Sequence, residues 1–130
     1  MPRLNPARAK RILLACQGAY YGVTGLWPLV SLSTFEHVTG PKTDDWLVRV
    51  VGALALVIGL VLFLASRRRN ISAEIGLLAV ASATAFAISD VVSVLTAGIS
   101  RIYLADAALQ SAFVIAWLIL WGKSPREIPV

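Results

Sequence analysis

Four long apolar stretches make up most of this 130-residue chain. They cover residues 12–32, 45–65, 72–96 and 101–121 and are separated by short polar segments. A helix of about 20 residues crosses the roughly 30 Å hydrocarbon core of a bilayer, because each residue adds about 1.5 Å of length. Each stretch therefore predicts a transmembrane helix. We expect an all-α integral membrane protein, a four-helix bundle that forms a single domain over residues 1–130.

The composition supports a membrane protein and leaves no room for a separate soluble domain. Hydrophobic residues make up 58% of the chain and charged residues only 15%. The net charge is +5, but the basic residues flank the apolar stretches. Basic residues at the ends of apolar stretches are typical of membrane proteins, where they set the orientation of the helices and attract anionic lipid. Membrane lipid is thus an expected partner, and nucleic acid is not.

The distribution of Lys and Arg predicts the orientation. Nine lie in the two terminal tails and in the turn at residues 67–69, and three lie at the other end, Lys42, Arg49 and Arg101. The positive-inside rule then places both termini in the cytoplasm, with residues 1–11 as a cytoplasmic tail. The loop at 33–45 lies outside, and we expect a short interfacial helix near residues 34–39. Ser33 and Glu36 have the spacing of a capping box for it.

Small residues line one face of each of the first two predicted helices: Gly18, Gly22 and Gly25, then Gly52, Ala55 and Gly59. Such faces let helix backbones approach closely in a membrane. They predict tight packing, either between helices of this chain or onto a second copy or a larger membrane complex.

Two carboxylates, Asp90 and Asp106, lie inside the last two apolar stretches. A charge at the centre of a bilayer costs at least about 2.5–3.5 kcal/mol, so such residues usually face a partner or a cavity. In the predicted orientation both lie in the outer half of the membrane, one or two helical turns from the outer surface. We expect them to meet there in a polar cavity that opens outward. Arg49 lies at a similar depth and either pairs with them or extends to the headgroups.

Further polar and aromatic side chains share these helix faces. Tyr103, Gln110 and Trp117 lie on the same stripe as Asp106, and Tyr21 and Thr24 lie at matching depth on the first helix. The candidate ligand-binding residues are Asp90, Asp106, Arg49, Tyr21, Tyr103, Gln110, Trp117 and Thr24.

This set favours binding of a small amphiphilic or cationic ligand. The alternatives are a salt-bridged polar plug, a structural or accessory subunit of a homo-oligomer or larger complex, and an enzyme that uses the carboxylate pair on a lipid-like substrate.

Known catalytic, nucleotide-binding and metal-binding motifs do not occur in the chain. His37 is the only histidine, and with the loop carboxylates Glu36, Asp44 and Asp45 it makes a poor metal site. Cys16 is the only cysteine, so the chain has no intramolecular disulfide chemistry. We expect no metal and no cofactor, and the motifs single out no catalytic residue.

Residues 35–48 read FEHVTGPKTDDWLV. This run, with Asp90 and Asp106 downstream, resembles a widespread set of small bacterial four-helix membrane proteins through the pattern F-E-x-V-T-G-x-K-x-D-x-W-L-V. The resemblance implies a bacterial inner-membrane protein and implies no activity. The layout is more loosely similar to DoxX-like proteins and to the sterol-isomerase/sigma-2-like fold, which uses intramembrane acidic residues around an apolar ligand. This chain lacks the intramembrane histidine of that second group.

Overall fold

The computed structural model describes residues 5–40 and 44–122, and all regular structure in these ranges is helical. The predicted all-α class is therefore confirmed. The helices are α1 (Pro6–Val30), α2 (Leu32–Thr39), α3 (Asp45–Ala65), α4 (Ala73–Ala97) and α5 (Ile102–Gly122).

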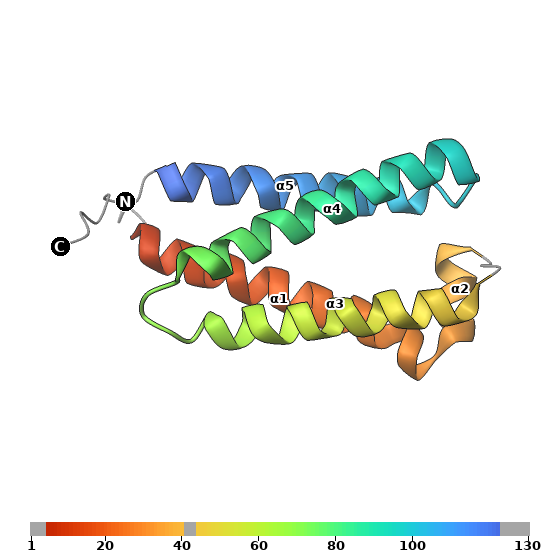
Figure 1. Cartoon of the computed structure of the whole chain (residues 1–130), viewed down its shortest axis with the longest axis horizontal. Coiled ribbons are helices and arrows are strands. Elements are labelled where there is room, and N and C mark those ends of the chain that lie inside the picture. The colour runs from red at the N-terminus through yellow and green to blue at the C-terminus, as the bar shows by residue number, and fades with distance from the viewer. Residues whose placement is uncertain (1–4, 41–43, 123–130) are drawn as a thin grey trace.

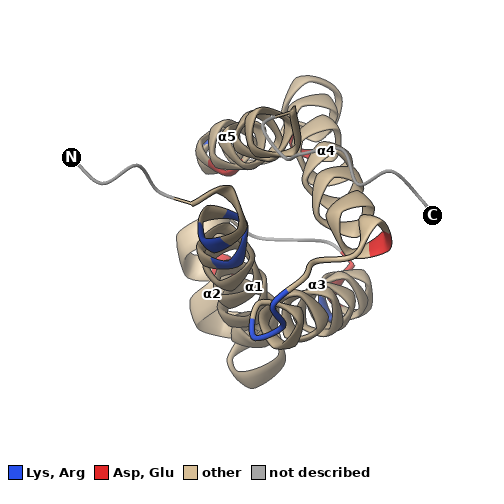
Figure 2. Ribbon diagram, turned by 90° about the vertical axis from the view of Figure 1, so that its left-hand side faces the viewer, with Lys and Arg blue, Asp and Glu red and all other residues tan. Residues whose placement is uncertain are grey.

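The four long helices form two pairs (Figure 1). α1 packs closely along α3, and α4 packs along α5. Between the pairs, α1 contacts α5, whereas α3 and α4 touch only sparsely. Figure 2 shows this arrangement from one end, with α1 and α3 on one side and α4 and α5 on the other. The short helix α2 lies at the opposite end of the molecule from the start of α1.

The helix bounds agree with the sequence for α3 and within one residue for α4 and α5. α1, however, begins at Pro6 and not at residue 12, so much of the predicted tail is helical. The side chain of Asn5 accepts a hydrogen bond from the Ala7 N–H, and proline is well suited to the first turn of a helix. The predicted short helix is present as α2, but the capping box is wrong, since α2 starts after Ser31 and has no side-chain cap.

The predicted glycine faces pack against each other between α1 and α3. A Cβ atom added to Gly59 would lie 2.5 Å from the backbone nitrogen of Gly22 and 2.6 Å from the carbonyl oxygen of Gly18. One added to Gly25 would lie 2.5 Å from the carbonyl oxygen of Gly52. The backbones are therefore in direct contact, and a larger residue would force the two helices apart.

Three helices, α3, α4 and α5, are long and apolar enough to cross a membrane, which marks the chain as a membrane protein. α1 has similar length but is more polar, because Gln17, Tyr20, Tyr21 and Thr24 interrupt its apolar sequence. Gln17 and Tyr21 are buried against the other helices.

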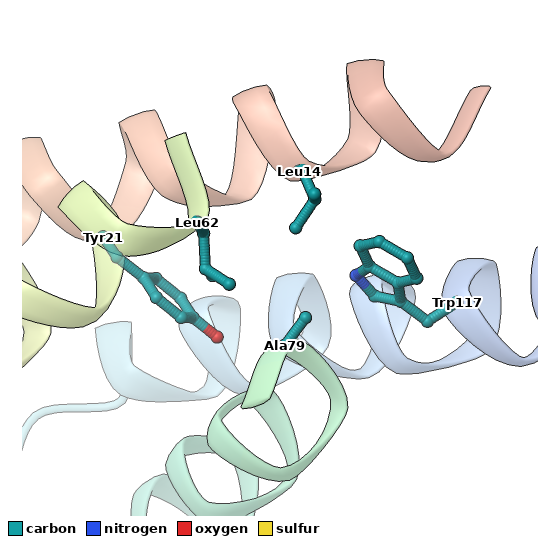
Figure 3. Packing of buried hydrophobic residues seen from close by; sticks show 5 residues of the cluster. All are labelled: Leu14, Tyr21, Leu62, Ala79 and Trp117. Atoms are coloured by element: carbon teal, nitrogen blue, oxygen red, sulfur yellow. The ribbon is translucent and has the colours of Figure 1, made fainter. Parts of the chain in front are cut away.

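The buried core joins all four long helices (Figure 3). It consists of Leu14 and Tyr21 from α1, Leu62 from α3, Ala79 from α4 and Trp117 from α5. Leu14, Leu62, Ala79 and Trp117 have no exposed surface. The two helix pairs are thus packed together through this core, and they lie farther apart at the end of the molecule where α2 lies (Figure 1).

Candidate functional site

A cavity of about 760 Å³ lies between the two helix pairs at the α2 end of the molecule. Its walls come from the second halves of α1 and α4, the first halves of α3 and α5, and α2. Most of the wall is apolar. Hydroxyl groups on it include those of Tyr20, Tyr21, Thr24, Ser89, Ser93 and Tyr103.

Asp90 and Asp106 both line this cavity, from α4 and α5 respectively, and their carboxyl groups lie close enough to interact. Asp90 is buried, and its Oδ2 atom has no hydrogen-bond partner among the described residues. A buried polar atom without a partner is costly and unusual in a folded protein. No lysine, arginine or histidine is among the described residues of the lining. The site therefore combines two acidic side chains with a largely apolar wall.

Asp106 is held by side chains from two helices. The Tyr20 hydroxyl donates a hydrogen bond to its Oδ1 atom from α1. The Gln110 Nε2 donates to the same oxygen from one turn further along α5, at 3.4 Å. These donors orient the Asp106 carboxyl group, whereas the Oδ2 atom of Asp90 has no hydrogen-bond partner among the described residues.

A chain of hydrogen bonds runs from Asp106 into the core. Tyr21 Oη donates to Gln110 Oε1 at 2.5 Å, and Gln17 Nε2 donates to Tyr21 Oη at 3.1 Å. Trp117 Nε1 in turn donates to Gln17 Oε1 at 2.7 Å. Every donor in this chain points toward the next member on the path to Asp106. Hydrogen bonds aligned in this way polarise and strengthen one another, so this series of hydrogen bonds stabilises a negative charge on Asp106.

The spacing of residues along two helices explains this network. Gln17, Tyr20, Tyr21 and Thr24 follow the i, i+3, i+4, i+7 spacing of one helix face. The face of α5 that carries Asp106, Gln110 and Trp117 lies opposite, and the bonds cross between the two helices. The polar side of α1 is thus buried against α5. Gln17 also bonds the carbonyl oxygen of Ala79 on α4, at 2.9 Å.

Six of the eight candidate ligand-binding residues line the cavity: Asp90, Asp106, Tyr21, Tyr103, Gln110 and Thr24. The other two do not. Arg49 is exposed and outside the cavity wall, so an inward pairing with the carboxylates is absent. Each residue turns a helix by about 100°, and Val48, Gly52 and Ala55 already occupy the face of α3 that meets the cavity. Arg49 therefore points to one side of it.

Trp117 is fully buried below the cavity. It lies seven residues beyond Gln110, about 10 Å further along α5, and contacts the core through Gln17. Trp117 does lie on the same face of α5 as Asp106 and Gln110, as predicted, but this face continues beyond the end of the cavity. Trp117 thus supports the site from beneath and does not line it.

Tyr20 belongs to the candidate site but was not among the residues predicted from the sequence. It lines the cavity and donates to Asp106. Its position three residues after Gln17 and four before Thr24 places it on the same helix face as both. Completing that spacing would have found it.

No group of three or more potential metal ligands occurs among the described residues. His37 is exposed on α2. The arrangement can pair a positive charge with carboxylate oxygen atoms and enclose an apolar group beside it.

The fold and the cavity together define a class: a helical membrane protein with a carboxylate-lined cavity between two helix pairs. Comparisons with known protein families, with curated proteins and with solved structures found no match.

Proposed function

We propose that this protein crosses the bacterial inner membrane as a four-helix bundle and binds a small cationic amphiphile in the cavity between its helix pairs. Both termini lie in the cytoplasm, α2 lies at the outer interface, and the cavity opens outward. Three observations support this placement: the apolar α3, α4 and α5, an α1 of similar length beside them, and the basic residues at the end where α1 begins (Figure 2). The resemblance of residues 35–48 to small bacterial membrane proteins supports the choice of membrane.

The unpartnered carboxylate oxygen of Asp90 is the observation that carries the binding proposal. Within a membrane such an oxygen requires a cation or a hydrogen-bond donor, and the lining supplies no cationic side chain among the described residues. A protonated amine satisfies this requirement through a charge-assisted hydrogen bond. The apolar walls accommodate a hydrocarbon chain, and a volume of about 760 Å³ is within the roughly 300–1,000 Å³ of typical small-molecule sites.

The test is thermal unfolding of the purified protein in a non-ionic detergent with octylamine as the probe. Octanol and octanoate have the same chain length without the positive charge. We expect octylamine to raise the unfolding temperature of the wild type, since about a hundredfold excess over the dissociation constant adds about 2.7 kcal/mol of stability. Octanol and octanoate should have little effect.

Asp90→Asn keeps the shape of the side chain and removes its charge, so it should abolish the octylamine shift. Glu74→Gln is the matched control, because Glu74 is an exposed carboxylate in the first turn of the same helix, outside the cavity. It should retain the full shift. An equal octylamine shift in the wild type and in Asp90→Asn would reject the site, whatever the effect of the substitution on stability.

The glycine faces no longer support the alternative role as a subunit that docks onto another protein. Gly18, Gly25, Gly52 and Gly59 already contact one another between α1 and α3, so they do not offer a surface to another protein. Catalysis on a lipid-like substrate would use the same carboxyl pair, and no observation in the described residues favours it over binding.

A further inference from the structure

A second pocket, of about 530 Å³, lies at the opposite end of the molecule from the cavity. It is formed between the first turns of α1 and the turn that follows α3. Three arginines line it: Arg8 and Arg11 from α1, and Arg69 from the turn. None of its described lining residues is acidic. Residues far apart in the chain thus bring three positive charges to one concave site.

A hydrogen bond holds the two sides of the pocket together, and the dipole of α1 adds to the attraction that its arginines exert on anions. Arg11 Nε donates to the carbonyl oxygen of Ser66 at 3.1 Å, which ties the start of α1 to the end of α3. The positive end of the α1 dipole lies here, and Ala7 of its first turn is part of the lining. Ile12 and Ala15 provide an apolar wall on the side that leads toward the middle of the helices.

We propose that this pocket binds a phosphate group, carried either by the headgroup of an anionic phospholipid or by a soluble phosphate. Arginine binds phosphate through paired N–H donors with matching planar geometry, and two or more arginines around one pocket neutralise its charge. The apolar wall formed by Ile12 and Ala15 fits the start of an acyl chain below a lipid headgroup. The site is independent of the cation site, because the two pockets share no residue.

Two double variants separate this pocket from general attraction of the basic end to anions. Arg8→Gln with Arg69→Gln removes two charges from the pocket and leaves the Arg11 contact with Ser66 intact. Arg67→Gln with Arg68→Gln removes two charges from the same turn, outside the pocket lining. Both pairs change the net charge equally, so a difference between them reports on the pocket.

The first measurement is native mass spectrometry of protein released from bilayers of phosphatidylglycerol and phosphatidylcholine. Charge-assisted hydrogen bonds from arginine to the phosphate are lost only in the pocket pair, so we expect about tenfold or greater loss of bound phosphatidylglycerol there relative to the control pair. The second measurement is thermal unfolding in detergent with inorganic phosphate against chloride at equal ionic strength.

Loss of bound phosphatidylglycerol in the pocket pair alone supports a lipid headgroup as the ligand. Phosphate stabilisation that is lost in the pocket pair alone supports a soluble phosphate. The proposal is overturned if the two pairs behave alike in both measurements, or if the wild type retains no phosphatidylglycerol and gains no stability from phosphate.

Discussion

Gly59→Ala is expected to destabilise the folded protein by about 3 kcal/mol, the upper end of what overpacking usually costs. The added methyl group would lie 2.5 Å from the Gly22 nitrogen and 2.6 Å from the Gly18 carbonyl oxygen. These are backbone atoms, which cannot move aside by changing a rotamer. The substitution must therefore separate α1 from α3, the most extensive helix contact in the described chain. Unfolding in mild detergent with increasing dodecyl sulfate, followed by circular dichroism, measures the loss.

Gly22→Ala is the matched control, because it makes the same chemical change on the other side of this interface. Its added Cβ would meet nothing within 4 Å. Alanine is favoured over glycine within a helix by about 1 kcal/mol, so this variant should be neutral or more stable than the wild type. Similar destabilisation by both variants would show that α1 and α3 do not meet as described.

Gln17→Leu is expected to destabilise the protein by about 2 kcal/mol, since hydrogen bonds inside membrane proteins contribute about 0.6 kcal/mol each on average and Gln17 makes three. Its side chain has no exposed surface and bonds Tyr21, Ala79 and Trp117. Leucine restores none of these bonds and leaves the Trp117 N–H without an acceptor. Thermal unfolding followed by tryptophan fluorescence measures the change.

A double-mutant cycle with Trp117→Phe separates the lost bonds from the change of shape. In the Gln17→Leu background, phenylalanine removes the indole N–H that has lost its acceptor. Trp117→Phe should therefore lower the free energy of unfolding clearly less there than in the wild type. Thr84→Val serves as the control for a polar residue on the exposed side of α4, where the hydroxyl bonds its own helix. It should change stability by less than about 0.5 kcal/mol. Additive costs for Gln17→Leu and Trp117→Phe would argue against the bond between them.

The convergence of Asp90 and Asp106 was predictable because it depends on simple geometry. The rise per residue sets the depth of each carboxylate, and consecutive helices joined by a short turn run antiparallel. Tight packing of the glycine faces was predictable for a similar reason, since glycines at helical spacing mark where backbones meet, but the sequence left open whether the partner is a helix of this chain or another protein. Both inferences need only the position of a residue along one helix.

The features that the sequence reasoning missed depend on how helices are rotated or capped. Arg49 is only one residue after Val48, yet one is exposed outside the cavity and the other is part of the wall. The bond between Gln17 and Trp117 requires two distant helices to face each other at one level. The early start of α1 was signalled by Asn5 and Pro6, but the basic residues that follow were interpreted as a tail.

The span of one hydrogen bond has a consequence for how this protein is made. Gln17 and Trp117 are 100 residues apart in the chain. During synthesis the glutamine leaves the ribosome long before its indole partner, so in the proposed membrane arrangement the first helix enters the bilayer with its polar groups uncompensated. Close packing of α3 through the paired glycines covers only the neighbouring face of α1, because Gln17 and Gly18 are consecutive and lie about 100° apart around the helix. Nascent chains that stop before the last helix should therefore insert poorly and become early targets of membrane proteases, which makes the final segment the step that completes biogenesis.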